Sequence, residues 1–212
     1  MRIACLHTAE SNVAVFARVA AQRGLTLTHQ VRADLLAEAM QAGGVTAEIA
    51  ARTGEALLAL TNDADAVLLT CSTLGAAAED IASEAVVPVL RVDAALAQQA
   101  VRHGGKVAVL CAAKTTLGPT GALFEKAAQQ TGAVIDLRLV PNAWAAFLAG
   151  ETQQYLTMIA AAADQAFSEG VKTVALAQAS MADAAALCRH GTPLSSPSAG
   201  LDAIAAVLAR SL

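Results

Sequence analysis

The sequence predicts an α/β fold made of two similar halves, each with a parallel sheet flanked by helices. Short apolar runs alternate along the chain with longer segments of helical period, which is the pattern of a parallel sheet covered on both faces. A series of landmarks in the first half also returns in the same order in the second. With 56% hydrophobic residues in a length of 212, the chain has enough apolar side chains for a sizeable core.

The apolar runs predicted to be strands are short and are bounded by polar residues or glycine. In the first half they cover residues 3–7, 25–31, 66–70 and 87–90. In the second half they cover residues 107–111, 134–140, 173–177 and a short piece near Leu194. Because helical segments separate these runs, we expect neighbouring strands to be parallel.

The segments between the strands carry apolar residues at helical spacing and are too long to be strands. The strongest cover residues 11–23, 46–61, 117–130, 151–169 and 199–210. They supply the crossover connections that parallel strands require.

The second half repeats the first. Residues 2–4 (Arg-Ile-Ala) match residues 106–108 (Lys-Val-Ala), and the strand that leads to Cys71 matches the strand that leads to Gln178. We infer an internal duplication, with a first α/β half over residues 1–97 and a second over residues 98–212. The C-terminal helix of the first half can pack on the other half, and the second half can include a chain crossover. Ligands bind at the carboxyl ends of parallel strands, so we expect the halves to share a cleft there.

Composition excludes several classes of function. The net charge is -4 and the sequence has no run of basic residues, which argues against a nucleic-acid partner. The apolar start of the chain is too short for a secretory signal or a membrane span, so we expect a cytoplasmic protein without a membrane partner. The four cysteines lack CxxC and Cys/His ligand spacing. We therefore expect free thiols and no metal site.

Cys71 is the strongest catalytic candidate. It follows the apolar run 67–70 and precedes Ser72, Thr73 and a stretch rich in Gly and Ala, so it is expected at the N-terminus of a helix. The helix dipole and free N–H groups there lower the pKa of a thiol and favour the reactive thiolate. The alternative is a small buried hydrophobic residue. The equivalent position of the second half holds Gln178.

Other polar side chains also follow the predicted strands. His7 ends the first strand and is an acid/base or substrate-binding candidate near neutral pH. The hydroxyl groups of the strand-end loops can bind a carboxylate together with helical N–H groups, or they can serve as N-caps. These hydroxyl candidates are Ser11, Ser72, Thr73, Thr115, Thr116 and Ser180, and the amide of Gln178 joins them.

On these residues the chain resembles the aspartate/glutamate (hydantoin) racemase superfamily. The resemblance covers nearly the whole sequence, through Cys71-Ser72-Thr73, through the strand followed by Thr115 and Thr116, and through residues 193–197. It implies an isomerase that needs no cofactor, in which cysteines from the two halves flank the substrate carbon. In such a site one thiolate removes a proton and the other thiol returns one. It also implies a small carboxylate or cyclic amide as substrate, and a homodimer or higher homo-oligomer.

The sequence departs from the family pattern in its second half. Where the family has Gly-Cys-Thr, this chain reads Ala177-Gln178-Ala179-Ser180. An amide cannot transfer protons near neutral pH, so Gln178 puts two-base racemisation in doubt. The leading hypothesis is a racemase-like or isomerase-like enzyme that works through Cys71. The alternatives are a decarboxylase or other lyase with one cysteine, and a carboxylate-binding protein without activity.

Overall fold

The computed structural model describes residues 1–210 of the chain. The residues form two compact units. The first contains Met1–Ala95 together with the chain from Pro197 onward, and the second is Leu96–Ser196. The sequence-based division after residue 97 gave the C-terminal segment to the second half, whereas the structure groups that segment with the first unit.

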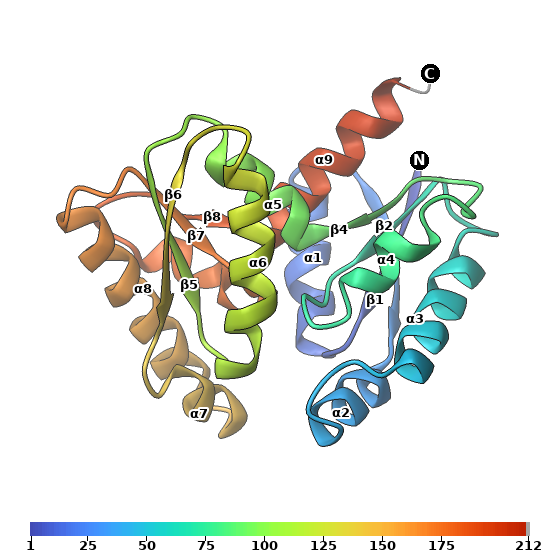
Figure 1. Cartoon of the computed structure of the whole chain (residues 1–212), viewed down its shortest axis with the longest axis horizontal. Helices are drawn as coiled ribbons and strands as arrows, with labels where there is room; N and C mark the ends of the chain where they lie inside the picture. The colour runs from blue at the N-terminus through green and yellow to red at the C-terminus, as the bar shows by residue number, and fades with distance from the viewer. Residues whose placement is uncertain (211–212) are drawn as a thin grey trace. The chain divides into compact units, whose positions relative to one another are not determined.

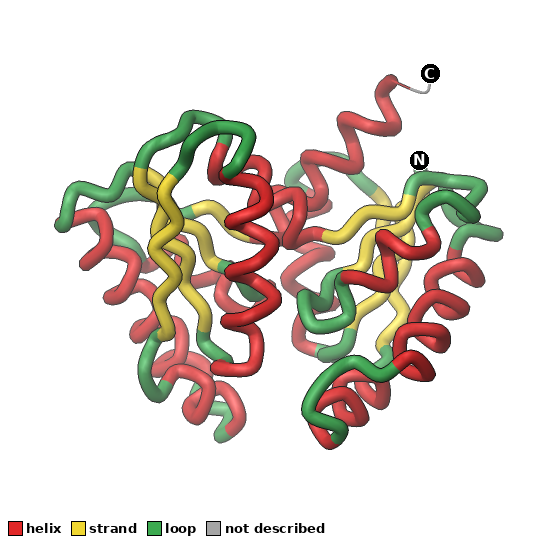
Figure 2. The backbone as a smooth tube through the Cα atoms, in the orientation of Figure 1, coloured by secondary structure: helices red, strands yellow, loops and turns green. Residues whose placement is uncertain are grey.

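The first unit is built on a parallel four-stranded sheet in the order β2-β1-β3-β4 (Figures 1 and 2). The strands are β1 (Arg2–His7), β2 (Thr26–Val31), β3 (Ala66–Leu69) and β4 (Val89–Arg91). Its helices are α1 (Ser11–Ala21), α2 (Ala33–Gln41), α3 (Ala47–Leu60), α4 (Ala76–Ile81) and most of α9 (Ser196–Arg210), and α5 (Val92–Val101) begins in this unit.

The second unit repeats this plan in the order β6-β5-β7-β8. Its strands are β5 (Lys106–Cys111), β6 (Val134–Leu139), β7 (Thr173–Leu176) and β8 (Leu194–Ser195). Its helices are α6 (Leu117–Ala128), α7 (Ala143–Leu148), α8 (Thr152–Ser168) and the 3-10 segments η1 (Lys114–Thr116) and η2 (Ala179–Leu187). None of the helices in the described part of the chain combines the length and the apolar character needed to cross a bilayer.

These observations confirm the predicted fold class of two α/β halves with parallel sheets flanked by helices. The duplication extends to the backbone hydrogen bonds at the strand ends. Thr70 N donates to the Leu6 carbonyl at 3.1 Å, and Ala177 N donates to the Leu110 carbonyl at 3.0 Å. Cys71 and Gln178 each come one residue later, so they occupy equivalent positions in the two units.

Burial explains why β1 holds the centre of its sheet. Residues 3–7 are fully buried, and successive side chains point to opposite faces. Ala4 and Leu6 belong to the apolar core that contains Leu35 of α2 and Leu57 of α3. Cys5 and His7 point to the other face, where the Phe16 ring of α1 lies 5.2 Å from the imidazole of His7. Both faces of β1 are therefore covered by helices, as the continuous apolar run in the sequence indicates.

Gly200 of α9 provides a test of how the C-terminal segment packs in the first unit. A Cβ atom at this position would lie 2.5 Å from Cγ1 and 2.9 Å from Cβ of Val92. We expect Gly200→Ala to lower the free energy of unfolding by about 1–3 kcal/mol, because crowding outweighs the better helix propensity of alanine. The matched control is Gly118→Ala in α6, where a Cβ meets nothing within 4 Å and stability should stay equal or rise. Urea denaturation of both variants measures the difference, and an unchanged Gly200→Ala variant would show that this contact is loose.

Candidate functional site

Cys71 lies at the carboxyl end of the first sheet, directly after Thr70. Its side chain is 8% exposed. A turn over residues 72–75 separates it from α4, which begins at Ala76 and has six residues. The sequence placed Cys71 at the N-terminus of this helix, and that placement is wrong by about one turn. The dipole of so short and distant a helix has little effect on the thiol.

Three hydrogen-bond donors lie around the sulfur of Cys71. The Thr8 hydroxyl and the backbone N–H groups of Leu74 and Thr73 each favour the thiolate. Burial has the larger effect, and the nearby Asp93 carboxylate acts in the same direction, so the pKa of the Cys71 thiol is raised above its usual value. The lowered pKa expected from the sequence is therefore wrong, because desolvation outweighs the local donors.

A buried ion pair shields Cys71 from the full charge of Asp93. Arg91 contacts both carboxylate oxygens of Asp93, with Nε and Nη2 each 2.8 Å from an oxygen, and Nη1 reaches Glu79 at 2.8 Å. The guanidinium passes directly over Gly75, where any Cβ atom would overlap it. Glycine in the turn after Cys71 thus makes room for the arginine that neutralises Asp93.

His7 lies inside the sheet beneath this loop. It is fully buried, its Nδ1 is 2.9 Å from the Thr70 hydroxyl, and its Nε2 is 2.9 Å from Nδ1 of His29. Burial, together with the neighbouring His29, lowers the pKa of His7 to about 4. His7 is therefore a neutral imidazole with protein partners on both nitrogens.

The first turn of α1 carries a polar atom that the sequence analysis did not single out. Asn12 is 8% exposed, and its Oδ1 has no hydrogen-bond partner among residues 1–210. Ser11, which was a candidate, is exposed beside it, and Glu10 rather than Ser11 is the N-cap residue. The available signal was the position of Asn12 in the loop that follows β1. An unpaired buried carbonyl oxygen is costly and can accept a hydrogen bond from a ligand.

In the second unit Gln178 follows β7 and is half-buried. Its Oε1 accepts hydrogen bonds from the backbone N–H groups of Ala112 at 2.6 Å and Ala113 at 3.2 Å. Only the oxygen of the amide can accept, so this contact fixes the side chain and leaves Nε2 to donate elsewhere. Gln178 is thus held as a hydrogen-bond donor at the position equivalent to that of Cys71.

The two threonines after β5 differ in their surroundings. Thr115 is exposed, whereas Thr116 is buried and its hydroxyl donates to the Ala113 carbonyl at 2.7 Å. The hydroxyl groups of Thr116 and Thr120 also contact the buried thiol of Cys111, whose pKa is raised by burial. Thr116 therefore shares the Ala113 loop with Gln178.

Ser180 lies in η2, and its hydroxyl is 2.8 Å from the phenol oxygen of the buried Tyr155. Burial raises the pKa of Tyr155 to about 12. No side-chain cap is formed at the start of η2, so the N-cap role considered for Ser180 is wrong. Ser72 and Thr73, the other two hydroxyl candidates, are half-buried and lie on the loop that follows Cys71.

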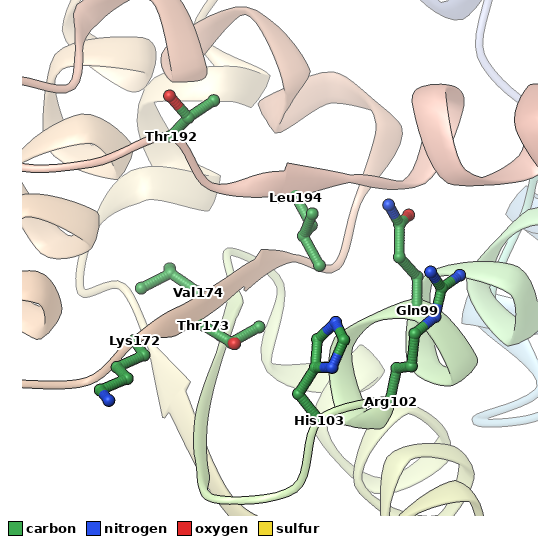
Figure 3. A pocket seen from close by; sticks show the side chains of 8 residues that line it. All are labelled: Gln99, Arg102, His103, Lys172, Thr173, Val174, Thr192 and Leu194. Carbon is green, nitrogen blue, oxygen red and sulfur yellow. The ribbon is translucent and has the colours of Figure 1, made fainter.

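A separate pocket of about 200 Å³ lies within the second unit (Figure 3). Its walls come from the C-terminal end of α5, the start of β7 and the segment that leads into β8. Arg102, His103 and Lys172 give it basic groups, and Gln99, Thr173 and Thr192 add polar ones. It opens near the amino end of β7, whereas Gln178 follows the carboxyl end, and none of the predicted site residues lines it.

One set of side chains has ligand atoms suitable for a metal. Cys5, His7 and His29 place their Sγ and ring nitrogen atoms within 4.8 Å of one another. No such set was expected from the sequence, because the cysteines lack ligand spacing within one segment. These residues come from two neighbouring strands, and only strand pairing brings them together.

The chain is similar to proteins of one family. The sequence profile of the Asp/Glu/Hydantoin racemase family matches residues 20–206. No curated protein sequence matches the chain.

Similar solved structures carry the same fold. An aspartate racemase homologue from Pyrococcus horikoshii OT3 has a TM-score of 0.72 at 14% identity, over 98% of this chain and 99% of that one. Allantoin racemase from Pseudomonas fluorescens has a TM-score of 0.63 at 16% identity, over 100% and 92%. Glutamate racemase RacE1 from Bacillus anthracis has a TM-score of 0.63 at 15% identity, over 99% and 82%.

The hydroxyl of Thr8 should tune the thiol of Cys71. We expect Thr8→Val to raise the apparent pKa of Cys71 further, because the thiolate loses a hydrogen bond that favours it. Alkylation by iodoacetamide as a function of pH, with the Cys71 peptide quantified by mass spectrometry, gives the midpoint. Thr120→Val is the matched control because Thr120 contacts Cys111 instead. An unchanged or lower midpoint in Thr8→Val would contradict the contact.

Proposed function

Because the chain belongs to the Asp/Glu/Hydantoin racemase family, we propose that it is an isomerase that acts on a small carboxylate or cyclic amide through Cys71 and without a cofactor. The observation that carries the proposal is the set of donors around the Cys71 sulfur at the carboxyl end of the first sheet. The likeness to aspartate, allantoin and glutamate racemase structures supports the fold on which such a site is built.

In the proposed reaction the Cys71 thiolate removes the proton next to the substrate carbonyl. Burial makes the thiolate scarcer but a stronger base once it forms, and the Thr8 hydroxyl with the Thr73 and Leu74 N–H groups stabilises it. Arg91 compensates the charge of Asp93, which would otherwise oppose ionisation further. The chain thus supplies an acid/base group without a histidine partner.

The substrate-binding groups proposed around Cys71 are of two kinds. The hydroxyl groups of Ser72 and Thr73 can donate to a carboxylate. The unpaired Oδ1 of Asn12 requires a donor, which an amino group or an amide N–H supplies. That combination suits an amino acid or a hydantoin-like ring better than a simple dicarboxylate. The other residues proposed to bind substrate are His7, Ser11, Thr115, Thr116, Gln178 and Ser180.

Gln178 favours a second candidate function, a decarboxylase or another lyase with one cysteine. With its Oε1 bound to the Ala112 and Ala113 N–H groups, the side chain can only donate, so it can hold a carboxylate or enolate oxygen but cannot return a proton. Loss of carbon dioxide needs only one proton donor, which Cys71 supplies. A carboxylate-binding protein without activity is the third possibility, and substrate turnover separates it from the other two.

The cellular setting is part of the same proposal. All four cysteines are free thiols, which suits the reducing cytoplasm. A homodimer or higher homo-oligomer is proposed from the resemblance to the family.

Replacing Cys71 tests the mechanism directly. We expect Cys71→Ser to lose activity by about 100-fold or more, the usual contribution of a general acid/base group. Aspartate, glutamate, allantoin and 5-substituted hydantoins are incubated in deuterated water, and proton exchange, inversion and loss of carbon dioxide are followed by NMR and polarimetry. Cys188→Ser, which removes a half-buried thiol of the second unit, is the matched control. Full activity in Cys71→Ser would exclude the mechanism, and ligand binding without turnover by the wild type would identify a binding protein.

Gln178→Cys tests the proposed place of the missing second base. If Gln178 faces the same substrate carbon as Cys71, the variant gains a second thiol and should invert a substrate faster than the wild type does. Gln178→Ser is the control, because it also removes the amide but adds no base of suitable strength. Polarimetry measures inversion, and NMR measures exchange in the same samples. If Gln178→Cys still exchanges the substrate proton but inverts the substrate no faster than the wild type, then Gln178 does not face the substrate carbon.

A further inference from the structure

Cys5, His7 and His29 form a cluster on the face of the first sheet that α1 covers. Cys5 and His7 are two residues apart on β1, so their side chains point to the same face. His29 lies directly opposite Cys5 in the register of β1 and β2, which brings its side chain to that face as well. Two of the three residues are fully buried and His29 is half-buried. The sheet itself therefore holds a thiol and two imidazoles together.

The hydrogen bonds of His7 fix which of its nitrogens carries the proton. The Thr70 hydroxyl donates its own proton to the Leu6 carbonyl at 3.1 Å, so it must accept from Nδ1 of His7. His7 is then protonated at Nδ1, and its Nε2 presents a lone pair toward His29 and Cys5. A metal-binding histidine has this arrangement, with one nitrogen free to bind and the other N–H held by an oxygen of the protein.

The second unit shows that the sheet does not need these residues for packing. The register of β5 and β6 matches that of β1 and β2, and it places Val109 opposite Leu137 where the first unit has Cys5 opposite His29. Ala177 stands at the position of Thr70. Cys111 stands at the position of His7, so the second unit has Val109, Leu137 and one thiol where the first has a Cys/His/His set. The two imidazoles are therefore a feature of the first unit and are not a requirement of the repeated fold.

The chemistry of the ligand atoms indicates which metals the cluster fits. The ligand set contains one sulfur and two nitrogens. Zinc-type ions prefer such ligands, whereas magnesium and calcium prefer oxygen.

We propose that Cys5, His7 and His29 bind one zinc-type divalent ion, with Thr70 holding His7 in the binding tautomer. On binding, the S–H bond of Cys5 breaks, a bond from sulfur to the metal forms, and the proton leaves to solvent, with no change of oxidation state. His29 moves its ring proton from Nδ1 to Nε2. Ligand atoms of a tetrahedral zinc site lie roughly 3.3–3.7 Å apart. The His7 and His29 nitrogens, now 2.9 Å apart, therefore need to separate slightly, while the widest separation in the cluster, at most 4.8 Å, needs to shorten. A water molecule completes the coordination on the half-buried side of His29.

The proposed ligands do not include the Cys71 thiol, although His7 is also among the residues proposed above to bind substrate. Cys71 packs in the apolar core with Ala4 and Leu6, on the opposite face of β1 from Cys5 and His7. The metal would join β1 to β2 and fix the strand end from which Thr8 reaches the Cys71 thiol. The inference therefore concerns a structural ion and does not depend on the substrate or on the reaction.

Titration of the metal-free full-length chain with Co²⁺ tests the site, because thiolate-bound Co²⁺ has an ultraviolet charge-transfer band and a tetrahedral site has strong visible bands. The wild type should bind one equivalent with both signatures, and Zn²⁺ should displace the cobalt and raise the melting temperature. We expect Cys5→Ala to lose the charge-transfer band. His29→Gln should weaken binding by about 100-fold or more, and Thr70→Val by about 10- to 100-fold.

Cys111→Ala is the matched control, because Cys111 is also a buried thiol at a strand end but lies beside Thr116 and Thr120. It should bind cobalt like the wild type. Circular dichroism of each apo variant verifies folding, and His29→Gln, at a half-buried position, keeps the test valid if Cys5→Ala is unstable. Absence of cobalt and zinc binding by the wild type would overturn the proposal, and so would a charge-transfer band that survives Cys5→Ala or disappears in Cys111→Ala.

Discussion

The parallel pairing of β1 with β3, and of β5 with β7, is the constraint on which the rest of the structure depends. The last backbone hydrogen bonds of these pairs, from Thr70 to Leu6 and from Ala177 to Leu110, fix where each strand ends. The next residue leaves the sheet at its carboxyl edge, and it is Cys71 in one unit and Gln178 in the other. The position of the candidate catalytic residue is therefore set by backbone geometry, whereas its chemistry is set by one side chain.

The duplicated scaffold carries different chemistry at equivalent positions. The first unit has a thiol at the strand end, a histidine pair inside the sheet and an unpaired Asn12 oxygen in the first turn of α1. The second has a fixed amide at the strand end, and it has Val109 opposite Leu137 where the first unit has Cys5 opposite His29. The group proposed to transfer protons is thus in one unit, and the other has a hydrogen-bond donor at the equivalent position. This division is compatible with chemistry that needs one base, and it is why the family name alone does not fix the reaction.

The sequence predicted the fold well because local patterns determine it. Strand and helix positions follow from apolar periodicity, and the equivalence of Cys71 and Gln178 follows from the repeat. Properties that depend on distances between separate elements could not be predicted from the sequence. The pKa of Cys71 depends on desolvation by residues from several elements, and the cluster of Cys5, His7 and His29 exists only through the register of two strands. The unpaired Oδ1 of Asn12 is likewise a property of packing, because nothing in the sequence says which polar atoms will lack a partner.

Burial links the two polar features of the first unit. An isolated thiol in a core would remain protonated and inert, yet Cys71 has three donors that become stronger as water is excluded. The same low dielectric keeps His7 and His29 neutral and leaves the lone pair of His7 Nε2 directed at its neighbours. Both groups lie next to residues 7–8, where β1 ends. A displacement of this strand end would therefore change the hydrogen bond between the Thr8 hydroxyl and the Cys71 sulfur. The two central strands are otherwise apolar between Ile3 and Leu6 and between Ala66 and Leu69. The hydrogen bond between His7 and Thr70 therefore joins the ends of two buried strands, and it connects the histidine pair to the loop that carries Cys71.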